Sequence, residues 1–142
     1  MTAKEYLMQA YRLDNRIKLD TEEYRTIREM AQGLSAVHYD SNTTQSNTPS
    51  DASFVKALNQ LWELEQKINE ELCMLSALKV QIRDVIDTVK DPNERLVLSY
   101  HYIGGLKWTE IAQEMSADAK TIRRWHGDAL SHVVMPKKPV QI

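Results

Sequence analysis

The chain has 142 residues and a net charge of −2, and glycine and proline together supply only eight of its positions. Because turns consume these two residues, their scarcity argues against a sandwich or barrel with a turn about every 10 residues. No apolar run approaches the roughly 18 residues of a transmembrane helix. The single cysteine excludes an internal disulfide and metal sites built from several cysteines. We therefore expect an all-α protein of the cytoplasm, without a membrane segment.

Residues 3–38 form the first candidate long helix. Its apolar side chains recur at steps of three, four or seven residues: Tyr6, Ala10, Leu13, Ile17, Tyr24, Ile27, Ala31 and Leu34. Asp20 takes the one apolar position that is missing from this heptad pattern. The spacing predicts a helix that pairs with another helix along its length.

A polar loop and a second long helix are predicted to follow. Residues 40–51 contain no large apolar side chain, which predicts a loop over 39–52. From about 52 to 90 the heptad positions are Phe54, Leu58, Leu61, Ile68, Leu72, Leu75, Ile82, Ile86 and Val89, widened by Leu64, Leu78 and Val85, with Glu65 and Lys79 in the two missing positions. The acids expected on a solvated face are Glu63, Glu65, Glu70 and Glu71.

The loop permits the chain to reverse, so residues 1–90 are expected to form a long, coiled-coil-like antiparallel helical hairpin. Its apolar stripe could equally serve a homodimer or another partner. We find no catalytic constellation in this part of the chain, and such heptads most often serve packing.

From residue 91 the pattern changes to short helices. Asp91 can cap a helix that Pro92 begins, and Glu94 can complete a capping box. This helix carries Leu96, Val97, Tyr100 and Ile103, and Gly104-Gly105 stops it. A second short helix holds Trp108, Ile111, Ala112 and Met115, and after Ser116-Ala117 a third, capped by Asp118, holds Ile122, His126, Ala129, Leu130 and Val133 on one side. Three short helices with a tight turn before the last predict a helix-turn-helix over 91–135, followed by a tail over 136–142.

Positive charge gathers in this last part of the chain. Residues 119–142 carry five Lys/Arg and one acid, a local charge of +4, whereas residues 1–90 carry 11 basic and 14 acidic residues, a charge of −3. The residues left outward on the last helix are Lys120, Thr121, Arg123, Arg124 and Gly127. Basic residues on this face are suited to meet phosphates. We expect His126 to pack in the core, and Trp125 to be half-buried or to contact a DNA backbone.

These residues resemble region four of bacterial sigma factors, the helix-turn-helix that reads the −35 promoter element and contacts RNA polymerase. The resemblance is carried by Pro92-Asn-Glu-Arg-Leu-Val-Leu, Tyr102-Ile-Gly-Gly-Leu, Trp108-Thr-Glu-Ile-Ala, Thr121-Ile-Arg-Arg and Ala129-Leu130. The chain departs from that pattern at Lys107, where a capping Thr or Ser is frequent, and at Ser116, where glycine is usual. Nothing resembles the sigma region that melts promoter DNA.

Nearly the whole chain is similar to small phage and prophage regulators of the ArpU and sigma-like late-gene type, found in Gram-positive bacteria. The matching segments are Lys4-Glu5-Tyr6-Leu7, Leu13-Asp14-Asn15-Arg16-Ile17, Thr48-Pro-Ser-Asp-Ala-Ser-Phe-Val55 and His126-Gly-Asp-Ala-Leu130. The resemblance implies a phage-encoded, DNA-binding activator of late genes that acts at promoters with RNA polymerase in a bacterial cytoplasm.

The residues expected to contact double-stranded DNA lie at the starts of the last two helices. They are Lys107, Trp108, Thr109, Lys120, Thr121, Arg123 and Arg124. Two alternatives are a DNA-binding assembly protein like a phage small terminase, and a sigma-like module that binds polymerase without reading DNA. We expect no enzyme, cofactor or metal site, because no phosphate loop, nucleophile–base pair or metal cluster is apparent.

Overall fold

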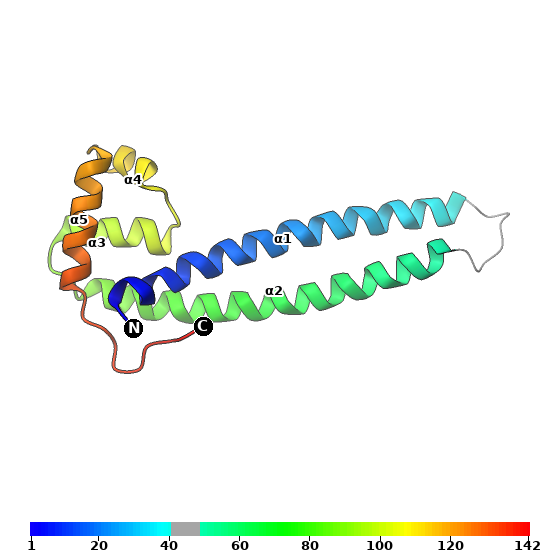
Figure 1. Cartoon of the computed structure of the whole chain (residues 1–142), viewed down its shortest axis with the longest axis horizontal. Helices are drawn as coiled ribbons and strands as arrows, with labels where there is room; N and C mark the ends of the chain where they lie inside the picture. The colour runs from blue at the N-terminus through cyan, green and yellow to red at the C-terminus, as the bar shows by residue number, and fades with distance from the viewer. Residues whose placement is uncertain (41–48) are drawn as a thin grey trace. The chain divides into compact units, whose positions relative to one another are not determined.

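The computed structural model describes residues 1–40 and 49–142, and every regular element in those residues is helical (Figure 1). The elements are α1 (Ala3–Asp40), α2 (Pro49–Asp87), α3 (Pro92–Leu98), the π-helical turn η1 (Ser99–Ile103), α4 (Trp108–Glu114) and α5 (Ala119–His132). The all-α prediction is confirmed, with a long N-terminal pair of helices. Among the described residues, none of the helices combines the length and the apolar character that a membrane crossing requires.

The two long helices extend a little further than the sequence predicts. Helix α1 continues to Asp40 and α2 begins at Pro49, so both enter the predicted loop over 39–52. Residues 41–48, the rest of that loop, lie outside the described residues.

The chain divides into two compact units. Unit 1 contains Met1–Asn15 and Cys73–Ile142, and unit 2 contains Arg16–Leu72. Unit 1 therefore joins the start of α1 and the end of α2 to all of the short helices. The sequence pattern, in contrast, changes at residue 90.

The apolar stripe of α1 is buried or half-buried at every predicted position. In the second stripe the prediction is wrong at two of its apolar positions. Leu58 and Leu72, assigned to the stripe from sequence, are 45% and 46% exposed. Ala57 and Glu71, each one residue earlier, are buried instead. The other apolar positions of the prediction are buried or half-buried, and so are the three residues expected to widen it: Phe54, Leu61, Leu64, Ile68, Leu75, Leu78, Ile82, Val85, Ile86 and, just after the helix, Val89. Apart from Ile86, this stripe keeps steps of four and three, which is the spacing that a pairing helix requires.

Acidic residues occupy one position of each stripe in unit 2. Asp20 is 7% exposed and Glu71 is 3% exposed, so the expectation that Glu71 lies on a solvated face is wrong. Lys67 Nζ lies 3.5 Å from Asp20 Oδ2, and Arg16 Nε lies 3.7 Å from Glu71 Oε2. Because residue 16 contacts 71 while residue 20 contacts 67, α1 and α2 run antiparallel there.

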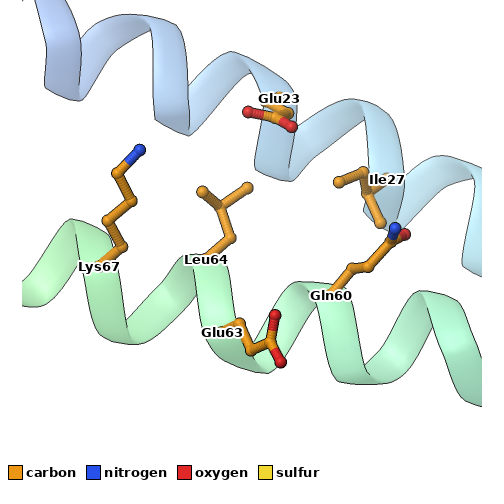
Figure 2. Close-up of a pocket in the computed structure, with 6 residues that line it drawn as sticks. All are labelled: Glu23, Ile27, Gln60, Glu63, Leu64 and Lys67. Atoms are coloured by element: carbon orange, nitrogen blue, oxygen red, sulfur yellow. The ribbon is translucent and has the colours of Figure 1, made fainter.

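An open groove of about 260 Å³ lies between α1 and α2 in unit 2 (Figure 2). Its lining residues are Glu23, Ile27, Gln60, Glu63, Leu64 and Lys67. The apolar side chains of Ile27 and Leu64 both lie between the two helices in this view. Both are half-buried, because the helices leave space beside them here.

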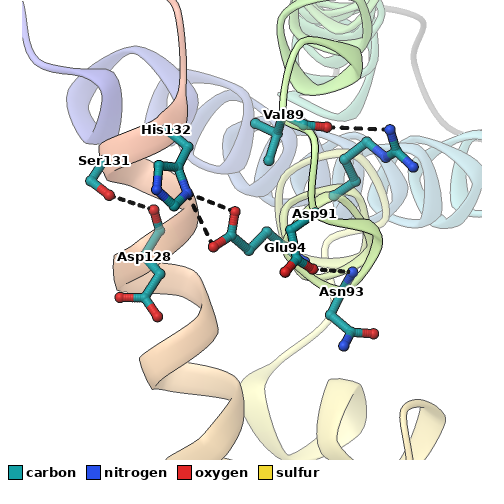
Figure 3. Close-up of polar contacts among 8 residues, drawn as sticks. Val89, Asp91, Asn93, Glu94, Asp128, Ser131 and His132 are labelled. Carbon is teal, nitrogen blue, oxygen red and sulfur yellow. Dashed lines mark hydrogen bonds and ion pairs between the residues drawn. The ribbon is translucent and has the colours of Figure 1, made fainter.

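In unit 1, α3 begins as predicted but Glu94 has another role. The Asp91 carboxylate accepts hydrogen bonds from the backbone N–H groups of Asn93 and Glu94, at 2.8 and 3.3 Å. Glu94 does not turn back to complete a capping box. Its buried carboxylate faces His132 at the end of α5, with Nδ1 at 2.8 Å from Oε2 (Figure 3). This ion pair raises the pKa of His132 and joins the start of α3 to the end of α5.

The inward faces of α3 and of the π-helical turn differ from the sequence expectation. Leu96, expected on the inward face, lies in α3 and is 45% exposed, whereas its neighbours Val97 and Leu98 are buried. In the turn that follows, His101 and Tyr102 are buried. A π turn places more residues in each turn than an α-helix, so an α-helical spacing assigns the wrong face after residue 98. Gly105 then takes φ +70°, a left-handed conformation that glycine adopts without a steric penalty, and the chain turns toward α4.

Helices α3, α4 and α5 share one core. Val97, Ile111, Ala112 and Ile122 form its buried centre. Half-buried side chains pack around it: Tyr100, Leu106, Trp108, Met115, Ala117 and Trp125. Of the two expectations for Trp125, a half-buried position and a contact with a DNA backbone, the structure shows the half-buried position. Helix α5 contacts both α3 and α4, so its inward face is fixed by two neighbours.

Candidate nucleic-acid interface

Helix α5 has one buried and one charged face. Ile122, His126 and Ala129 are buried, as predicted. Lys120, Arg123 and Arg124 are exposed on the other side. The cations lie in the first half of the helix, within one to two turns of its start, so their long side chains can reach the same ligand.

The start of α5 is fixed by a side-chain cap. The Asp118 carboxylate accepts a hydrogen bond from the backbone N–H of Thr121 at 2.8 Å, which confirms the predicted cap. This hydrogen bond, with a contribution from the charge of Arg124, lowers the pKa of the Asp118 carboxyl. Thr121 itself is half-buried, so it offers less of its side chain to a ligand than Lys120 or Arg123.

A short turn connects α4 to α5. Helix α4 ends at Glu114 and α5 begins at Ala119, with a backbone hydrogen bond from Ala117 N–H to the Ala112 carbonyl, 3.0 Å. Ser116 adopts φ +52°, the left-handed region that usually favours glycine. The turn therefore keeps a geometry suited to glycine although a serine occupies it.

At the start of α4, Lys107 and Thr109 are exposed. A lysine side chain cannot accept a hydrogen bond, so Lys107 cannot cap the helix as Thr or Ser would. Instead the Glu110 carboxylate accepts a hydrogen bond from the backbone N–H of Lys107 at 3.1 Å. This satisfies a main-chain donor next to the helix start and leaves the Lys107 ammonium outside the cap.

The Trp108 ring packs inward, where sequence reasoning expected a contact with DNA. It stacks on His101, with ring centroids 4.1 Å apart, and lies 4.6 Å from the His126 ring. Tyr11 stacks on His101 with ring centroids 5.1 Å apart, which adds α1 to this cluster. The half-buried Trp108 therefore links α4 to its neighbours, and only part of its side chain remains for a ligand.

The histidines of this cluster favour their neutral form. Burial, followed by the charges of His101 and Lys4, lowers the pKa of His126 to about 4. Burial also lowers the pKa of His101, whose Nδ1 lies 2.8 Å from the Leu106 carbonyl oxygen. The Tyr102 hydroxyl lies 2.6 Å from His126 Nε2. His126 is thus a core histidine, as predicted, whereas the central place of His101 has no counterpart in the sequence reasoning.

The exposed cations of this arrangement are suited to binding an anion. Exposed cations border the α4–α5 turn, while Asp118 and Glu110 are occupied with helix starts. In the part of the chain that the structure describes, no group of three or more His, Cys, Asp or Glu side chains could hold a metal ion.

The predicted site residues do not all share one environment. Lys107, Thr109, Lys120, Arg123 and Arg124 are exposed, while Trp108 and Thr121 are half-buried. Comparison of the chain with protein-family models, with curated proteins and with solved structures finds no match, so the function has to be inferred from the chain's own residues.

Proposed function

We propose that the chain is a DNA-binding transcription regulator whose α4 and α5 form a helix-turn-helix. The observation that carries this proposal is the basic outer face of α5, Lys120, Arg123 and Arg124, opposite a face buried against α3 and α4. The short turn and the Asp118 cap support it, because they hold α5 at a defined start.

In this proposal, α5 enters the major groove. Arginine can donate two hydrogen bonds to the edge of a guanine, which suits Arg123 and Arg124 to base recognition. Lys120 contacts a phosphate as a point charge. Lys107 and Thr109 meet the DNA backbone from the start of α4, which positions the protein without reading sequence.

The resemblance to sigma region four and to ArpU-type phage regulators extends the proposal. By that resemblance, the chain activates late phage genes at promoters together with RNA polymerase. The exposed apolar side chains of Val55, Leu58 and Trp62 on α2 support a role of the long helices in binding a partner or a second copy. A dimer would place two recognition helices about 34 Å apart, or a multiple of that distance.

The test begins with selection of bound DNA from a random-sequence pool, followed by fluorescence anisotropy with the selected duplex. We expect Arg123→Ala plus Arg124→Ala to weaken binding at least tenfold, because a bidentate guanine contact is worth about 1–3 kcal/mol. A duplex of scrambled sequence separates base recognition from general attraction to phosphate.

The matched control removes the same charge elsewhere. Arg28 and Lys56 are exposed on the long helices of unit 2. Arg28→Ala plus Lys56→Ala should leave DNA binding within about twofold, since neither residue belongs to the proposed contacts. If the α5 variant, with helicity intact by circular dichroism, binds the selected duplex as wild type does, the proposed recognition helix is wrong.

The alternatives predict different results in the same preparation. A ring of eight or more subunits would favour an assembly protein like a small terminase. Binding to polymerase that needs no DNA and is insensitive to salt would favour a module that does not read DNA.

A further inference from the structure

Residues 138–142, in the segment that follows α5, are bonded through their backbone to two glutamine side chains of unit 1. Gln81 on α2 donates from Nε2 to the Lys138 carbonyl at 2.9 Å, and its Oε1 accepts from the Val140 N–H at 2.8 Å. Gln9 on α1 donates from Nε2 to the Val140 carbonyl at 2.9 Å, and its Oε1 accepts from the Ile142 N–H at 2.9 Å. Each glutamine amide thus pairs with the peptide backbone as a neighbouring strand would.

The hydrogen bonds select alternate residues of the segment. Val140 uses its N–H and its carbonyl, and Ile142 its N–H, while the backbone of residue 139 takes no part in these bonds. The residue at 139 is a proline, which has no N–H to give. If the segment moved by one residue so that Pro139 took the place of Val140, Gln81 Oε1 would have no N–H to accept from. The position of Pro139 therefore fits the observed alignment and not the one in which the segment is shifted in that direction.

Tyr6 holds both glutamines in place. Its side chain is fully buried, and its hydroxyl donates to Gln81 Oε1 at 2.6 Å. The backbone carbonyl of Tyr6 also accepts from Gln9 Nε2 at 3.2 Å. Both amide groups therefore contact the same residue of α1.

We propose that Gln9 and Gln81, positioned by Tyr6, form a binding site for an extended peptide segment. Residues 138–142 of the same chain occupy it, and a separate peptide can take their place when they are displaced. The ligand needs free N–H groups at two alternate positions, corresponding to Val140 and Ile142. It needs no particular charge, because all four contacts are made to main-chain atoms. This site is independent of the proposed DNA binding.

The test displaces the chain's own segment without shortening the protein. In the full chain, Val140→Pro removes the N–H that Gln81 accepts. A peptide with the sequence of residues 136–142 is then titrated to about 5 mM, and the backbone amide signals of residues 5–10 and 78–85, next to Gln9 and Gln81, are followed by NMR. Wild type should need a higher peptide concentration for the same shift, because the tethered segment competes at an effective concentration on the order of millimolar. The Val140→Pro protein should show saturable shifts.

Two protein variants and two altered peptides test the chemistry of the site. Adding Gln9→Ala and Gln81→Ala to the Val140→Pro chain should weaken peptide binding at least tenfold, whereas adding Gln66→Ala, an exposed glutamine of unit 2, should not. In the peptide, proline at the position of Val140 should abolish binding. Proline at the position of Gln141, whose N–H makes none of these bonds, should be tolerated.

Hydrogen exchange in wild type supplies an independent readout. The Val140 and Ile142 amides should exchange slowly. Gln81→Ala should make the Val140 amide exchange faster, and Gln9→Ala should make the Ile142 amide exchange faster. Fast exchange of both amides in wild type would overturn the site itself. Slow exchange together with no peptide binding by a folded Val140→Pro chain would overturn the proposal that a separate peptide can bind.

Discussion

Two carboxyl groups, Asp20 on α1 and Glu71 on α2, lie buried in the apolar stripes of unit 2. Neither Glu71 oxygen has a hydrogen-bond partner within the described ranges, and Arg16 Nε lies 3.7 Å from Oε2. Burial and the neighbouring Asp20 carboxyl raise the pKa of Glu71 above its ordinary 4.5. The folded state then holds this proton more tightly than the unfolded state, so stability is full below pH 4.5 and falls as the pH rises through the raised pKa.

We expect Glu71→Leu to increase the free energy of unfolding at pH 7 by about 1–2 kcal/mol, because an apolar residue replaces a poorly paired buried charge. The variant should also lose the part of the pH dependence that Glu71 causes. Urea unfolding at several pH values between 4 and 8, followed by circular dichroism, measures both effects.

Glu70 provides the control, since it is adjacent to Glu71, carries the same charge and is exposed. Glu70→Leu should leave the pH dependence as in wild type. A Glu71→Leu protein that is less stable than wild type at pH 7, with an unchanged pH profile, would show that the buried carboxylate is well paired.

The sequence identified Asp20 in its heptad position but placed Glu71 on the surface. At two places in α2, residues 57 or 58 and residues 71 or 72 both fit steps of three and four, and choosing Leu58 and Leu72 put Glu71 outside the stripe. The sequence of α1 could have indicated the buried position of Glu71. Asp20 occupies an apolar position of the α1 stripe, so an acid in the partner stripe of α2 was a reasonable expectation.

At the scale of elements, the turn between α4 and α5 carries strain at Ser116. We expect Ser116→Gly to raise the free energy of unfolding by about 0.5–1 kcal/mol, because glycine removes the cost of a left-handed backbone but has more freedom to lose on folding. Tryptophan fluorescence during urea unfolding is suitable, since Trp108 and Trp125 belong to the same core.

A serine-to-glycine substitution in a regular helix should change the free energy of unfolding in the opposite direction. Ser76 is exposed within α2, where Ser76→Gly should lower the free energy of unfolding by about 0.5 kcal/mol. If both glycine variants are destabilised, Ser116 is not strained.

Element boundaries were largely readable from sequence, and inward faces less so. Asp91 and Asp118 marked two helix starts correctly because their caps are local. The burial of His101 and the pairing of Glu94 with His132 depend on the π turn and on an element 38 residues away. Neither leaves a periodic pattern that a local reading can detect.

At the scale of the whole molecule, we expect self-association through α2. Val55, Leu58 and Trp62 are 55%, 45% and 64% exposed and are spaced three and four residues apart on the same side of the helix. If this face binds a second copy, Leu58→Ser plus Trp62→Ser should shift the mass in light scattering from dimer to monomer at tens of micromolar.

Val80 is a matched control, because it is 60% exposed on α2 but belongs to unit 1. Val80→Ser should leave the mass unchanged. A wild-type monomer at the same concentration would contradict self-association through this face.

The extended segment at the end of α5 shows what sequence cannot supply at this scale. Its hydrogen bonds join residues more than 50 positions apart, and they are made to main-chain atoms that every residue offers. Residues 136–142 therefore read as a tail, although four hydrogen bonds hold them.

The buried acids also limit how α1 and α2 can align. An uninterrupted apolar stripe repeats every seven residues, so one helix could slide by a heptad and keep most of its contacts. Such a slide would set Asp20 and Glu71 each opposite an apolar position and remove Lys67 from Asp20. The acids thus penalise the shifted alignments more than the observed one. Replacing Glu71 by leucine would stabilise the helix pair and at the same time make it less selective about its own alignment.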